Sequence, residues 1–244
     1  MWRKIKKHGW KIAVALMTIL IVGGYYLLRP YEPNQLAMEA LKGDQRVDVE
    51  EIDQIIYFKS YEETQGTVIF YPGGLVKTEA YAPLAYNLAL NGMDTYLVHM
   101  PLNLAVFGEN RASNLNFDEL EQPIVIGGHS LGGVMASRFA TENEDLVDGV
   151  FFHASYPDED GDLSNKNLSV LSITATNDEI LNWESHEQAQ IYLGEEITKI
   201  VIEGGNHGQF GSYGQQRGDG DAEITEQEQL QEITEAMLNW IQIN

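Results

Sequence analysis

Residues 124–133 constrain the fold of this chain more than any other part of its sequence. They read Ile-Val-Ile-Gly-Gly-His-Ser-Leu-Gly-Gly, an apolar run that passes through Gly-x-Ser-x-Gly into an amphipathic helical pattern. A serine on a tight turn between a strand and a helix takes a strained backbone conformation, and side chains two residues to either side would collide. Gly128 and Gly132 avoid that collision. The pattern predicts that Ser130 projects above the end of a strand, and that the amide of Leu131 can stabilise an oxyanion at a helix N-terminus.

The rest of the chain alternates between strand and helix signals. Helical spacing links Tyr81, Leu84, Ala85 and Leu88, a second helix follows Ser130, and a last helix opens with a capping box at residues 225–228. Short β-rich runs lie at residues 55–58, 68–71, 95–98, 124–126, 149–152, 170–173 and 200–202. Because several of these runs are continuously apolar, they predict an α/β fold whose mostly parallel sheet is flanked by helices on both faces.

A serine is a weak nucleophile, so Ser130 needs a base, and the base needs an acid to orient it. Three histidines follow Ser130, of which only His207 lies in a glycine-rich loop after the last predicted strand. Such a loop can reach back over the sheet, which favours His207 as the base. Asp178 follows the strand at residues 170–173 and is the predicted acid, with Glu179 as the alternative.

A second oxyanion donor is expected in the loop after the strand at residues 68–71. That loop reads Tyr-Pro-Gly-Gly-Leu-Val over residues 71–76. Two glycines allow a backbone to approach a ligand closely. The predicted donor is the amide of Gly74, and Leu75 is the alternative.

These motifs, in this order, resemble those of the α/β-hydrolase superfamily, within the branch of dienelactone hydrolases and small bacterial esterases. The resemblance covers about residues 52–242 and rests on Pro72-Gly73-Gly74, the Ser130 turn, Asp178 and the His207 loop. It implies a sheet of eight strands or slightly fewer, acyl-enzyme chemistry and no cofactor. The chain departs from dienelactone hydrolases because it has no cysteine for the nucleophile. It also leaves only residues 155–168 for a cap, which predicts a hydrolase without a cap domain and with an open site.

Charge is distributed unevenly along the sequence. Residues 1–29 hold six of the 15 basic residues and no acidic one, so residues 30–244 carry nine basic residues against 37 acidic ones, a formal balance of −28. A domain this acidic repels phosphate backbones, which disfavours nucleic acid as a partner. The acidic runs at residues 158–162 and 219–221 are interpreted as solvated loops, and no metal site is predicted.

The N-terminus has the pattern of a membrane anchor. Five cations between Arg3 and Lys11 precede an uncharged run at residues 12–28, which at about 1.5 Å per residue is just long enough to span hydrocarbon. The basic flank favours the cytoplasm, which places the later residues outside a cell membrane that the chain crosses once. The alternative is a signal peptide cleaved near residues 22–24. We therefore expect an anchor at residues 1–29, a tether that can hold one short helix at 30–50, and a catalytic domain at 51–244.

The expected function is that of a serine hydrolase that cleaves a small-molecule carboxylic ester through Ser130, Asp178 and His207. Two alternatives remain open at the level of the sequence. The same acyl-enzyme can transfer its acyl group to a cell-surface alcohol, and a surface-displayed relative can bind ligands without catalysis.

Overall fold

The computed structural model describes residues 10–11, 14, 16–18, 23–24, 28–61, 63–194 and 197–243. The chain divides into two compact units, Met1–Tyr31 and Glu32–Asn244. Most of the predicted span at residues 12–28 lies outside the described residues. Among those that are described, no helix has both the length and the apolar character needed to cross a membrane. The N-terminal anchor stays a prediction.

The second unit is built on one eight-stranded sheet with the order β1-β2-β4-β3-β5-β6-β7-β8. β1 and β2 pair antiparallel, as do β2 and β4, whereas every pair from β4 to β8 is parallel. The strands are β1 Val47–Ile52, β2 Ile55–Ser60, β3 Gly66–Tyr71, β4 Met93–Val98, β5 Ile124–His129, β6 Gly149–His153, β7 Ser169–Ala175 and β8 Ile197–Ile202. The predicted α/β architecture with a mostly parallel sheet is confirmed.

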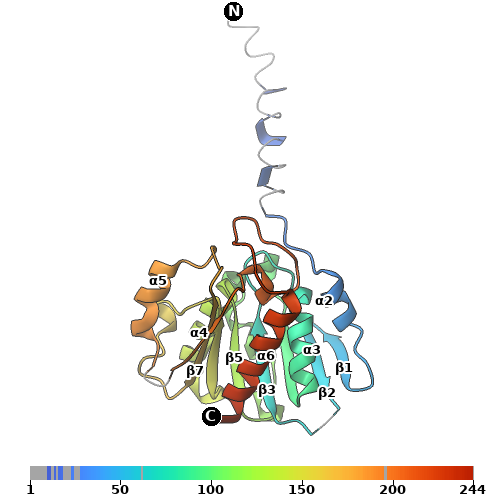
Figure 1. Cartoon of the computed structure of the whole chain (residues 1–244), viewed down its shortest axis with the longest axis vertical. Coiled ribbons are helices and arrows are strands. Elements are labelled where there is room, and N and C mark those ends of the chain that lie inside the picture. The colour runs from blue at the N-terminus through green and yellow to red at the C-terminus, as the bar shows by residue number, and fades with distance from the viewer. Residues whose placement is uncertain are drawn as a thin grey trace, which may run out of the picture. The chain divides into compact units, whose positions relative to one another are not determined.

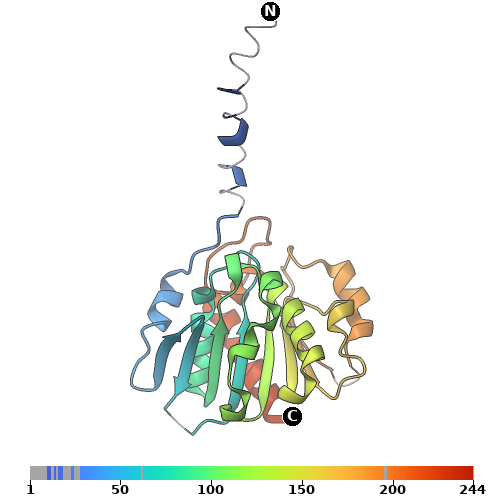
Figure 2. The same ribbon diagram turned by 180° about the vertical axis from the view of Figure 1, so that it is seen from behind.

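Helices cover both faces of this sheet. α3 and α6 lie over the face that is toward the viewer in Figure 1, and α4 lies over the opposite face, which Figure 2 shows from the front. The helices are α2 Gln35–Ala40, α3 Ala82–Leu90, α4 Leu131–Glu142, α5 Trp183–Gln188 and α6 Glu226–Ile243. The predicted capping box begins α6, because Glu228 Oε2 accepts from the Thr225 amide and Thr225 Oγ1 accepts from the Glu228 amide.

Successive residues of a strand point to opposite faces, so each strand fills two cores. Ile69 of β3 and Ile126 of β5 pack with Met135 and Phe139 of α4 in one core. On the other face, the ring of Phe70 lies 4.7 Å from that of Tyr81, between the centroids. This double coverage buries all six residues of β3 and all six of β5, and so fixes the carboxyl ends of the strands, where the predicted site residues follow.

The segment at residues 30–50 differs from expectation in one respect. It holds the one short helix that was expected there, α2, but β1 begins at Val47, so the sheet starts inside the segment expected as a tether. β1 was missed because its sequence, Val-Asp-Val-Glu-Glu-Ile, mixes acids with apolar residues, as an edge strand with a solvated side does.

Between β4 and β5, the chain forms only short 3-10 helices. The connection from β6 to β7 likewise holds one short 3-10 helix, Glu159–Gly161.

Candidate active site

Ser130 stands on a strained turn between β5 and α4. Its φ of 51° and ψ of −122° place it outside the regions that residues with a side chain ordinarily occupy. Its amide donates to the His153 carbonyl at 2.9 Å, and its own carbonyl accepts from Ser155 Oγ at 2.6 Å. These bonds anchor the turn to the neighbouring strand β6.

The glycines beside the turn are required by the backbone of the preceding strand. A Cβ on Gly128 would lie 2.2 Å from the carbonyl oxygen of Tyr71, and a Cβ on Gly132 would lie 2.1 Å from the same atom. Real Cβ atoms do not approach an oxygen so closely, so the turn can pack against the end of β3 only with glycine at both positions.

Strained backbone is concentrated at this end of the sheet. Within the described residues, six non-glycine residues have positive φ, and all except Asp53 follow the carboxyl ends of β3, β4, β5 or β6. These five are Leu75, Leu102, Asn103, Ser130 and Ala154. Because such conformations persist only where the surrounding structure imposes them, their clustering favours a functional site here.

Asp178 and His207 are brought together by the loops after β7 and β8. Nδ1 of His207 lies 2.8 Å from Oδ2 of Asp178, and both side chains are buried. The other carboxylate oxygen of Asp178 accepts from the amides of Ile180 and Leu181, at 2.9 and 2.7 Å. These donors hold the carboxylate in place, so Nδ1–H of His207 can donate to it and leave Nε2 as a proton acceptor. Glu179, the alternative acid, is exposed.

The ring of His207 packs against the ring of His129, which precedes Ser130, with 4.4 Å between the centroids. This contact brings the base loop to the serine turn. The described part of the structure records no hydrogen bond between Ser130 Oγ and His207. Asp178 therefore contacts His207 by a direct hydrogen bond, whereas His207 is linked to the Ser130 turn by the packing of its ring against His129.

The loop after β3 leaves one amide available near the serine. The Gly73 amide donates to Tyr81 Oη at 3.0 Å, and the Leu75 amide donates to the Asn103 carbonyl at 2.7 Å. The amide of Leu75 is thus already paired, which favours Gly74 over Leu75 as the oxyanion donor. Among the described residues, the amide of Gly74 has no such partner, and a Cβ on Gly74 would lie 3.3 Å from Cδ2 of Leu131. The oxyanion loop at Gly74 therefore packs against the side chain of Leu131, the residue that carries the other predicted donor.

Tyr81 and His129 form a buried relay that the sequence motifs do not indicate. Tyr81 Oη accepts from Gly73 and lies 2.8 Å from Nδ1 of His129, to which its proton can be donated. Burial, and then the neighbouring His207 and His153, lower the pKa of His129 well below its ordinary value. A neutral His129 thus links the oxyanion loop to the serine turn through Tyr81.

Asp219 and Gln229 hold the base loop and were also missed. The carboxylate of Asp219 accepts from the amides of Gly208, Glu179 and Gly220, at 2.7, 3.2 and 2.9 Å. It therefore ties the acid loop to the base loop, contrary to the interpretation of residues 219–221 as a merely solvated loop. The buried side chain of Gln229 bonds both the amide and the carbonyl of Asn206, which precedes His207. No local pattern signals either role, because both join residues far apart in the sequence.

Among the described residues, no group of three or more histidine, aspartate or glutamate side chains is arranged to hold a metal ion. The chemistry that this geometry can support is proton transfer at His207 and nucleophilic attack by Ser130, whose turn leads into Leu131 beside the Gly74 loop.

Comparison with known proteins identifies a family model and solved structures that resemble this chain. A model of the α/β-hydrolase family matches residues 67–231. A hyperthermophilic esterase from Pyrobaculum calidifontis is 17% identical with a TM-score of 0.58, and the match covers 83% of this chain and 88% of the esterase.

Two further solved structures share the fold. A predicted CIB-like hydrolase from Thermoplasma acidophilum has a TM-score of 0.56 at 15% identity, over 79% of this chain and 98% of that one. Est1E from Butyrivibrio proteoclasticus has a TM-score of 0.54 at 15% identity, over 81% and 99%. No curated protein matched. The family model spans more than half of the chain and includes the Ser130 turn, Asp178 and His207, and the chain belongs to the α/β-hydrolase family.

Proposed function

We propose that this hydrolase cleaves carboxylic esters through an acyl-enzyme on Ser130. The observation that carries the proposal is the buried pair of His207 and Asp178, packed against the strained turn that presents Ser130. The esterase among the structural neighbours supports the same reaction class.

The reaction follows from the roles of these groups. Ser130 Oγ attacks the ester carbonyl carbon while Nε2 of His207 takes the hydroxyl proton, and the carbonyl oxygen becomes an oxyanion. The amides of Gly74 and Leu131 donate to that oxyanion. As the tetrahedral intermediate collapses, the alcohol leaves with the proton from His207 and the acyl group stays on Ser130. Water then attacks the acyl-enzyme, gives its proton to His207 and releases the acid, and the proton returns to Ser130.

Asp178 contributes by orientation and charge. Its carboxylate accepts from Nδ1 of His207, which fixes the tautomer that presents Nε2 as a base and stabilises the imidazolium that forms. Two backbone amides hold that carboxylate, so the base keeps its orientation throughout the cycle.

The test is a set of single substitutions in the full-length chain, Ser130→Ala, Asp178→Asn and His207→Ala. Each should lower ester turnover by about 10³-fold or more, and a double variant should lose little beyond a single one, because the three residues act as one unit. Asp145→Asn is the matched control, an exposed acid in the short segment between α4 and the amino end of β6. A Ser130→Ala variant that keeps more than about a tenth of the turnover, a barrier change of only ~1.4 kcal/mol, would refute the nucleophile.

We also propose that residues 12–28 hold the domain on the outer face of a cell membrane, a proposal that rests on the basic flank and the uncharged run of the sequence. Protease added to intact cells should then remove the activity, and the full-length mass should appear in the membrane fraction. A soluble product that begins near residue 25 would indicate a cleaved signal peptide instead, and activity that survives the protease would contradict the orientation.

A further inference from the structure

Three large apolar side chains are exposed within six residues, in the loop that follows β4. Leu102 is 76% exposed, Val106 45% and Phe107 60%. We call these three residues the apolar rim. In the rest of the described part of the second unit, exposed large apolar residues stand singly in the sequence. Burying such side chains is favourable, so a concentrated group of them left in solvent indicates a binding surface.

The rim is held rigidly by strained backbone. Leu102 and Asn103 have φ values of 55° and 56°, and the left-handed region is unfavourable for a leucine. Asn103 is fixed there because its carbonyl accepts from the amide of Leu75, at 2.7 Å. Met100 and Ala105, between and beside the rim residues, are buried in the core. The loop therefore presents exposed leucine, valine and phenylalanine on an anchored backbone.

The rim is continuous with the oxyanion loop. Leu104 lies within the rim segment, and its Cδ2 is 3.8 Å from the position of a Cβ on Gly74, whose other neighbour is Leu131. Gly74 thus lies against the side chains of two leucines, Leu104 and Leu131. No charged residue occurs from Met100 to Gly108, in a chain with a net charge of −22. An oxyanion held at Gly74 therefore has an uncharged, apolar surface directly beside it.

We propose that the apolar rim binds the acyl chain of the substrate, so that the preferred substrates are neutral esters of medium-length aliphatic acids. This inference rests on the proposed ester hydrolysis and specifies its substrate class. The occupant of the rim is the substrate, because the hydrogen bond between the Leu75 amide and the Asn103 carbonyl joins the rim to the oxyanion loop. A second copy of the chain and a lipid surface are the occupants that the test must separate from it.

The test compares p-nitrophenyl octanoate with p-nitrophenyl acetate, for the full-length protein at one fixed detergent concentration. Leu102→Asn is the informative variant, because asparagine tolerates positive φ and the backbone of the loop is preserved. The ratio of kcat/KM for octanoate to that for acetate should fall about tenfold, the effect of losing an apolar contact with the substrate. Phe107→Ser should act in the same direction. Ile243→Asn is the control, since Ile243 is 83% exposed at the end of α6, and its ratio should not change.

The outcomes separate this inference from the proposed function. Labelling of Ser130 by a fluorophosphonate, in wild type and in Leu102→Asn alike, shows an activated serine independently of acyl length. If the serine labels and esters are cleaved, but Leu102→Asn keeps the wild-type ratio, the rim inference is overturned and the proposed function stands. A Leu102→Asn variant that instead loses self-association, or loses binding to neutral vesicles, with an unchanged ratio would assign the rim to a second copy or to lipid. If wild type neither labels nor cleaves, the proposed function itself fails.

Discussion

At the scale of single residues, the candidate site depends on polar contacts that join loops rather than on the three predicted catalytic side chains alone. Tyr81 is the clearest case, because its hydroxyl group contacts both the oxyanion loop at Gly73 and the serine turn at His129. The chain also offers a matched tyrosine. Tyr71 is equally buried, and its hydroxyl donates to the Glu109 carbonyl and accepts from the Ala112 amide. The two tyrosines make the same kinds of bond in different places.

Tyr81→Phe should therefore lower kcat for a neutral ester by about 10- to 100-fold with little change in KM, because it releases the oxyanion loop without removing a substrate contact. Tyr71→Phe should lose comparable stability, about 1–3 kcal/mol for the unpaired groups, and keep kcat within about twofold. Steady-state kinetics and urea unfolding of both variants measure the two effects. Equal losses of kcat in the two variants would show that the hydroxyl of Tyr81 has only a structural role.

At the scale of elements, the neighbouring strands β5 and β6 end in paired histidines, His129 and His153. Neither ring nitrogen of His153 has a hydrogen-bond partner in the described structure, and its ring packs among Phe70, Phe151 and Phe210. Burial lowers the pKa of His153 to about 3. An unfolded chain takes up a proton at this residue near pH 6.5, whereas the folded one does not, so stability must fall as pH drops from about 6.5 toward 3.

His153→Phe keeps the ring among its aromatic neighbours and removes this proton. Relative to wild type, the variant should gain about 2 kcal/mol of unfolding free energy at pH 5 compared with pH 7.5. Urea unfolding at the two pH values measures the difference, and the value at pH 7.5 isolates any effect of ring shape. His129 remains in both proteins, and because burial is the largest cause of its lowered pKa, it stays neutral in both folded proteins at these two pH values. A substitution effect that is the same at both pH values would mean that His153 is not kept neutral by the fold.

The same scale shows what the sequence can and cannot predict. β3 and β5 were predictable because they are continuously apolar and buried on both faces. The turn at Ser130 was predictable because its glycines avoid a steric clash between residues close together in the sequence. β1 escaped prediction since an edge strand need satisfy only one face. Gln229 and Asp219 escaped for a different reason: each bonds a backbone that lies many residues away. A contact of that kind exists only after the sheet has brought α6 and the two loops together.

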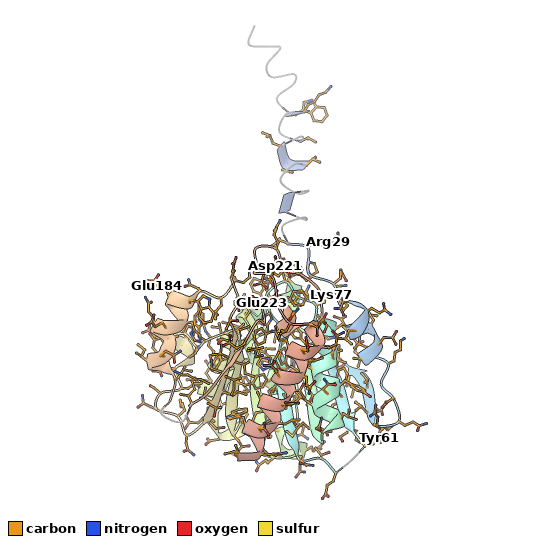
Figure 3. All side chains as sticks on the ribbon, viewed as in Figure 1. Arg29, Tyr61, Lys77, Glu184, Asp221 and Glu223 are labelled. Atoms are coloured by element: carbon orange, nitrogen blue, oxygen red, sulfur yellow. The ribbon has the colours of Figure 1, made fainter. Side chains whose placement is uncertain are left out.

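At the scale of the whole molecule, charge is the dominant feature. Residues 30–244 carry nine basic against 37 acidic residues, and some of these acids lie close to the candidate site in space. Figure 3 shows Asp221 and Glu223 at the end of the domain where the strands have their carboxyl ends, whereas Tyr61 lies at the opposite end. Asp221 also lies beside the acid loop, since its carbonyl accepts from Nδ2 of Asn177, the residue before Asp178. The field of these acids therefore acts at the entrance to the site rather than on a remote face.

Anionic esters should be kept away from such a site, so their kcat/KM should rise with ionic strength, while neutral esters respond weakly. The Debye length shrinks from about 30 Å at 0.01 M to about 10 Å at 0.1 M, so most of the change belongs in that interval. The measurement is kcat/KM across this range for two esters that differ only by a carboxylate on the acyl chain. Asp221→Asn and Glu223→Gln together should flatten the response of the anionic ester, because they remove charge at the entrance without touching Ser130, Asp178 or His207. Parallel, flat responses of the two esters in the unaltered protein would mean that the acidic surface maintains solubility and has no part in selecting the substrate.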